Sequence, residues 1–90
     1  MGLIRALFRF LFPPVFVISI QDGSVHKRRG RVAAAFLNDC SDVAREAGII
    51  SGTIYGVRHR GGVGLEFSSN IPPDCHQRFR NVWGLHRGRG

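Results

Sequence analysis

From Val15 onwards the hydrophobic pattern is that of a strand, because the sequence VFVISI places Phe16, Ile18 and Ile20 on one face. A period of two is typical of a β-strand. The Asp22-Gly23 pair that follows favours a two-residue hairpin turn. The returning stretch, residues 24–31, has no apolar face and is rich in Lys and Arg. We therefore expect a hairpin whose second strand lies at a sheet edge, where charge discourages pairing with another sheet.

The next alternating stretch predicts a second hairpin. A strand over residues 53–59 is followed by Gly61-Gly62, which turn the chain. The last strand then alternates hydrophobic residues with small or polar ones, and its hydrophobic positions are Val63, Leu65 and Phe67. This hairpin therefore has one clear apolar face.

Each hairpin is followed by a segment with hydrophobic residues at helical spacing. The first helix is predicted over residues 33–47 with Gly48 as its C-cap, and the second begins near Pro72-Pro73, since proline suits a first turn. The apolar stripes are Phe36, Cys40, Val43, Ala44 and Ala47 in the first helix and Cys75, Phe79, Val82 and Trp83 in the second.

The two halves of the chain resemble each other at a shift of 39 residues, which lays residues 69–83 on 30–44 and 54–62 on 15–23. Large and small side chains exchange across this shift, as for Phe36 and Cys75. We therefore interpret the chain as two ββα repeats and expect an α+β fold of order ββαββα. Its four-stranded antiparallel sheet would carry both helices on one face and follow an N-terminal hydrophobic helix. The opposite sheet face is expected to carry Ser19, Gly56, Arg58, Gly64 and Glu66.

The chain divides into a hydrophobic leader over residues 1–13, the ββαββα domain over 14–84 and a basic flexible tail over 85–90. Ten helical residues reach only about half of the ~30 Å hydrocarbon thickness. We therefore expect the leader to lie in the membrane interface, and the alternative is a helix packed on the domain. The expected membrane contacts are Leu3, Arg5, Leu7, Arg9, Phe10 and Leu11.

The charge balance is strongly basic, with 13 Lys and Arg against 6 Asp and Glu and a net charge of +7. Such a field favours phosphate-bearing partners such as nucleic acid, the ribosome or anionic lipid, although it also serves solubility alone. Stacking aromatics for single strands are not expected, since Tyr55 and Trp83 have core-like positions. The residues expected to converge on a basic binding surface are Lys27, Arg28, Arg29, Arg31, Arg58, Arg60, Arg78 and Arg80.

Catalytic chemistry finds no support in the motifs. The four histidines and two cysteines have no metal-ligand spacing, and the six carboxylates are scattered. Cys40 and Cys75 fall on the apolar stripes, so we expect buried, reduced thiols. We therefore predict no enzyme activity, no metal, no cofactor and no small-molecule substrate.

Several short motifs follow one another between Pro14 and Trp83. They are PVF at 14–16, GRV at 30–32, FLNDC at 36–40, SGTI at 51–54, LEFS at 65–68, IP at 71–72 and QRFRNV at 77–82. Together they resemble a bacterial family of small uncharacterised proteins with one N-terminal hydrophobic segment and a compact domain. The resemblance implies a membrane segment beside the domain, and it gives no catalytic residues to carry over because no activity is assigned to that family. The chain departs from the family where Ala33-Ala34 replace a proline pair, and in a shorter leader that bears two arginines.

Two functional hypotheses follow. The leading one is a non-enzymatic binding or adaptor module, held at the cytoplasmic side of a bacterial inner membrane by residues 1–12 and presenting its basic domain to a partner. The alternative is a soluble cytoplasmic protein that binds nucleic acid or the ribosome through the same basic surface.

Overall fold

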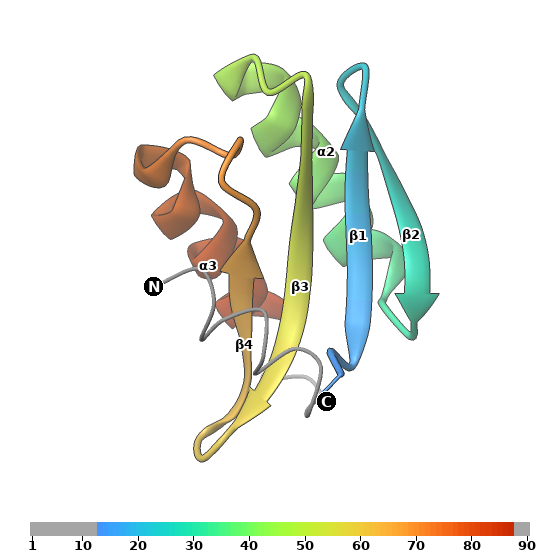
Figure 1. Cartoon of the computed structure of the whole chain (residues 1–90), viewed down its shortest axis with the longest axis vertical. Coiled ribbons are helices and arrows are strands. Elements are labelled where there is room, and N and C mark those ends of the chain that lie inside the picture. The colour runs from blue at the N-terminus through green and yellow to red at the C-terminus, as the bar shows by residue number, and fades with distance from the viewer. Residues whose placement is uncertain (1–12, 88–90) are drawn as a thin grey trace.

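The computed structural model describes residues 13–87, which form one sheet covered on one face by two helices (Figure 1). The α+β class, the four antiparallel strands and the two helices are confirmed. The elements are β1 (Phe16–Gln21), β2 (Ser24–Gly30), α2 (Ala34–Ala47), β3 (Ser51–His59), β4 (Gly62–Phe67) and α3 (Pro73–Arg87). The expected N-terminal helix and all six expected membrane contacts lie outside the described residues. Within residues 13–87, no helix has the length and apolar character that crossing a bilayer requires.

The strand order is β2-β1-β3-β4, so the two hairpins lie side by side with β1 and β3 at the centre. One row of the sheet runs through Gly30, Phe16, Gly56 and Leu65, which stand opposite one another on successive strands. The chain enters β1 at this row, β2 ends there, and β3 runs past it to the β3–β4 turn. The entry into β1, the end of β2 and the β3–β4 turn therefore share one end of the sheet.

The core lies between the sheet and the two helices. Phe36, Cys40 and Phe79 are completely shielded from solvent, as the helical stripes predict. Trp83 is half-buried at the margin, where its ring contacts the rings of Phe16 and Phe36 at centroid distances of 5.3 and 5.0 Å. The helix α2 ends as predicted, because Gly48 adopts the left-handed conformation and its N–H donates to the carbonyls of Ala44 and Arg45 in the last turn.

Glycine occupies two inward positions of β3 because neighbouring side chains fill the space that a Cβ would need. A Cβ on Gly56 would lie 2.2 Å from the ring of Phe16, and one on Gly52 would lie 2.4 Å from the side chain of Ile71. Gly56 is buried, and Arg58 lies two residues further along β3 and therefore on the same side of the sheet. The prediction that these two residues face outward is therefore wrong, whereas Ser19, Gly64 and Glu66 do lie on the outer face.

Tyr55 lies on the outer face of the sheet, between Val17 and Glu66 on the neighbouring strands. The prediction that it is a core residue is therefore wrong. The single shift of 39 residues fails in the strands for the same reason, since it lays Tyr55 on the buried Phe16. The hairpin turns begin at Asp22 and Arg60, which are 38 positions apart. The 39-residue shift holds only for the helices, and the duplication itself stays an interpretation.

Candidate functional site: a basic end and a basic edge strand

The edge strand β2 carries Lys27, Arg28 and Arg29 in succession, and all three are exposed. The pairing of β2 with β1 is irregular here, because Val17 stands opposite Arg29 and Ile18 opposite Lys27. Arg28 is therefore the extra residue of a β-bulge, a feature that redirects side chains at sheet edges. We call these three residues the basic edge.

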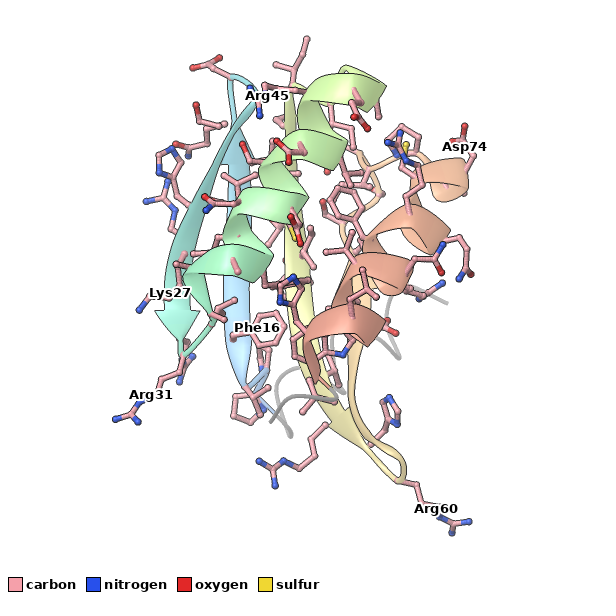
Figure 2. The ribbon with its side chains drawn as sticks, turned by 180° about the vertical axis from the view of Figure 1, so that it is seen from behind. Phe16, Lys27, Arg31, Arg45, Arg60 and Asp74 are labelled. Carbon is pink, nitrogen blue, oxygen red and sulfur yellow. The ribbon has the colours of Figure 1, made fainter. Side chains whose placement is uncertain are left out.

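The bulge directs Arg28 onto the outer face of the sheet. Its Nε donates a hydrogen bond of 2.7 Å to the hydroxyl of Ser19 in β1. Arg29 stands opposite Val17, whose side chain also lies outward because it alternates with the buried Phe16 and Ile18. Two cationic groups therefore lie beside each other on this face, while Lys27 occupies the other side of the strand and points away from the sheet (Figure 2).

Three further arginines mark the end of the domain at which the chain enters β1. Arg31 follows β2 directly, Arg58 stands opposite Val63 beside the β3–β4 turn, and Arg60 lies within that turn. Figure 2 shows Arg31 and Arg60 projecting from this end on opposite sides. Within residues 13–87, none of the three forms an ion pair with an acidic side chain. We call them the basic end.

The opposite end of the domain is where acidic residues gather. Asp22 lies in the β1–β2 turn, and Asp74 lies in the first turn of α3. Figure 2 shows Asp74 and Arg45 at the end remote from Arg31 and Arg60. The cations near this end are paired, since Arg45 bonds Asp42 and Arg78 bonds Glu46 across the two helices. The domain therefore has a charge dipole along its long axis.

The eight basic residues expected to form one surface are thus divided by the fold. Arg78 faces Glu46 at the helix layer. Arg80 lies at the edge opposite β2, where its guanidinium lies 5.3 Å from the ring centroid of Phe67 and donates to the carbonyl of Leu65. Of the eight, Arg78 alone has an acidic partner among the described residues, and Arg80 is set apart at the far edge, which leaves the basic end and the basic edge as the remaining exposed cations. They meet at the end of β2, where Arg29 and Arg31 are separated by Gly30 alone.

The outer sheet face was missed as a candidate site because Tyr55 was assigned to the core. Besides Tyr55 it carries Val17 and Val57, both partly exposed, and the ring of His59 covers the position where a Cβ of Gly64 would stand. The signal that could have found it is the alternation of Tyr55 with Ile54, which is completely buried. This face adjoins Arg28 and Arg29, so it extends the basic edge across the sheet.

The titratable residues of the interior serve packing. Burial, with a smaller contribution from Asp39, raises the pKa of the Cys40 thiol to about 12, so the thiol is protonated at neutral pH. His76 stacks on Phe67 at 4.1 Å, and His86 bonds Asp39 at 2.7 Å. Among residues 13–87, no group of three or more His, Cys, Asp or Glu side chains is placed to hold a metal ion.

Comparison with known proteins places this chain in a family. The family described as "Protein of unknown function (DUF3634)" matches residues 2–89, which is nearly the whole chain. The chain belongs to the DUF3634 family. No curated protein and no solved structure gives a significant match. For this DUF3634 protein, the expectation of a small uncharacterised family is confirmed.

Proposed function

We propose that the protein is a non-enzymatic binding module held on the cytoplasmic face of a bacterial membrane, with its basic end against anionic headgroups. One observation carries this proposal: Arg31, Arg58 and Arg60 lie at the end where the chain enters β1 from the leader. A leader inserted in the interface would bring these three arginines to the headgroups. The acidic end would then point away from the membrane.

The energetics favour this orientation. Each basic residue near an anionic bilayer surface contributes about 1 kcal/mol of attraction, which falls off within a Debye length of about 8 Å at physiological salt. Three arginines at one end therefore add about 3 kcal/mol, which is comparable to insertion of one or two leader side chains, since each buried CH₂ contributes about 0.8 kcal/mol. Either contribution alone gives weak binding, so we expect both to be needed.

Vesicle flotation tests the proposal with the full chain. The protein is mixed with vesicles of phosphatidylcholine containing phosphatidylglycerol, or with phosphatidylcholine alone. We expect flotation with the anionic vesicles, loss of most of it for the pair Leu7→Asp and Phe10→Asp, and at least a tenfold weaker affinity for the pair Arg31→Gln and Arg60→Gln.

The matched control removes the same charge at the other end of the domain, through Arg45→Gln and Arg78→Gln. Because these two arginines are ion-paired and remote from the entry into β1, we expect this control to bind vesicles within about twofold of the wild type. Equal loss of vesicle binding for both arginine pairs would show that only the net charge of the protein matters. Unchanged flotation after Leu7→Asp and Phe10→Asp would show that the leader is not the anchor.

A second candidate function is nucleic-acid or ribosome binding, and the placement of Arg28 favours it. The Ser19 hydroxyl holds the Arg28 guanidinium on the outer sheet face, which also carries Tyr55. Exposed cationic groups held along an edge strand suit the phosphates of a nucleic acid. RNA affinity that decreases steeply with salt, with a smaller salt dependence when Arg28, Arg29 and Arg31 are changed to Ala, would support this candidate. RNA binding that does not depend on salt would exclude it.

A further inference from the structure

The two edges of the sheet differ in whether their backbone groups are covered. At the β4 edge, the carbonyl of Val63 accepts a hydrogen bond of 2.7 Å from the indole N–H of Trp83, and the carbonyl of Leu65 accepts one from Arg80. His76 stacks on Phe67 along the same edge. Side chains from three successive turns of α3 therefore close β4 to any further strand.

The β2 edge is open. Six of the seven residues from Ser24 to Gly30 are exposed, and the seventh is partly exposed. The two-residue turn pairs Gln21 with Ser24, so hydrogen-bonded and non-hydrogen-bonded pairs alternate from there along β1 and β2. The N–H and C=O groups of Val25 and Lys27 consequently point away from β1. They form the same kind of ladder that β4 would offer if α3 did not cover it.

The charges on β2 decide what can pair with this edge. A second copy of the chain would bring its own Lys27, Arg28 and Arg29 against the same residues, and like charges directly opposite on paired strands destabilise them. An acidic strand would place opposite charges across from one another, and such pairs stabilise paired strands. It would meet Lys27 on one side of the sheet and Arg28 with Arg29 on the other, so neighbouring acidic residues are suited to both sides.

We propose that β2 is a docking edge for an extended acidic segment of a partner protein, which adds a fifth strand beside Val25 and Lys27. The backbone ladder would supply the pairing, and the basic edge would select an acidic sequence and exclude a second copy. This inference does not depend on membrane attachment, because the basic end and not the basic edge carries that proposal.

The test uses the full chain and a labelled acidic octapeptide, VEDVEDVT, with blocked ends, followed by fluorescence anisotropy. The neutral peptide VQNVQNVT reports the contribution of charge. A version of the acidic peptide with an N-methyl group on every backbone amide keeps every charge and cannot form the ladder with either of its edges. We expect binding of the acidic peptide, at least tenfold weaker binding of the neutral one and no measurable binding of the N-methylated one.

Two variants at Lys27 separate the backbone from the side chain. Lys27→Gln removes the charge, and Lys27→Pro removes the same charge together with the N–H that points to the open edge. Proline is tolerated at such an edge position because no bond to β1 is lost. We expect Lys27→Gln to lower the affinity for the acidic peptide about threefold. Lys27→Pro should lower it at least tenfold further than Lys27→Gln does, and both variants should keep the circular dichroism spectrum of the wild type.

Amide hydrogen exchange of the wild type gives an independent readout, in which the acidic peptide slows exchange at Val25 and Lys27. The proposal fails if the N-methylated peptide binds as well as the unmodified one, or if both Lys27 variants bind alike. It also fails if oligouridylate or anionic vesicles displace the peptide while binding Lys27→Pro and Lys27→Gln equally, because β2 would then be an anion-binding surface without strand pairing. Loss of vesicle binding in the Arg31 and Arg60 variant leaves peptide binding unchanged, so the two proposals can fail separately.

Discussion

Trp83 of α3 donates its indole N–H to the main-chain carbonyl of Val63 in β4 over 2.7 Å. Its ring also contacts Phe16 of β1 and Phe36 of α2. One half-buried side chain therefore joins both hairpins and both helices. It does so beside the edge strand that would otherwise expose its backbone.

Replacing Trp83 by Phe should separate the hydrogen bond from the packing. Trp83→Phe retains most of the ring contacts and leaves the Val63 carbonyl without its donor, so we expect a loss of about 1 kcal/mol in unfolding free energy. Trp83→Ala removes both and should cost about 3 kcal/mol. Urea unfolding followed by circular dichroism measures both values. Leu85→Ala, at a residue that is 70% exposed, should change stability by less than about 0.5 kcal/mol, and a Trp83→Phe variant as stable as that control would leave the bond without a stabilising role.

The fold could be predicted because its signals are local. Alternation along β1 and β4, the Asp22-Gly23 turn and the helical stripes each occur within a few residues of one another, and all are present in the structure. The strand β3 was misread because its inward positions include Gly52 and Gly56. A buried glycine gives no hydrophobic signal, so the sequence pattern assigns the inward position to Tyr55.

The candidate site could be predicted only in part. The basic edge follows from the sequence because its residues are consecutive. The pairing of Arg78 with Glu46 could not be foreseen, since these residues are 32 positions apart and meet only when α2 packs on α3. The same holds for the basic end, because Arg31 and Arg60 reach the same end of the sheet only through the pairing of β1 with both β2 and β3.

Gly56→Ala should be strongly destabilising, although the substitution adds only one methyl group. The new methyl group would stand 2.2 Å from the ring of Phe16 in a packed core, and overpacking of this kind costs about 1–3 kcal/mol. The cost should fall by at least half in a Phe16→Leu background, since the shorter side chain vacates the space. Thermal and urea unfolding of the wild type and the three variants in this cycle provide the measurement.

The matched control for that prediction is Gly84→Ala in α3. No atom lies within 4 Å of the Cβ that this change would add. Alanine favours a helix over glycine by about 1 kcal/mol, so the same substitution should stabilise here. Similar effects at Gly56 and Gly84 would contradict the assignment of Phe16 to the space above Gly56.

Cys40 should make stability decrease in alkaline solution. Burial raises its pKa from 9.0 to about 12, so between these values the folded protein keeps a proton that the unfolded chain has lost. Stability contributed by the protonated thiol is fully present below pH 9 and is lost as the pH rises toward 12, with a slope of up to about 1.4 kcal/mol per pH unit. Urea unfolding at pH 8, 9 and 10 measures this slope. Cys40→Ala should lack this part of the decrease, and parallel curves for the two proteins would contradict it.

The contact between His86 and Asp39 should secure the last turn of α3 against α2. The atoms His86 Nε2 and Asp39 Oδ2 are 2.7 Å apart, and the His86 ring also meets the edge of Phe36 at 5.6 Å. Because the Asp39 side chain is 44% exposed, water screens the pair, and we expect a coupling of only about 0.5–1 kcal/mol in a double-mutant cycle of Asp39→Asn and His86→Gln. The local effect should be larger than the global one, since helix ends open without unfolding the sheet. Asp39→Asn should therefore speed amide exchange at Leu85 and His86 while leaving Ile18 and Ile54 unchanged, and uniform acceleration at all four amides would show that the pair stabilises the whole domain instead.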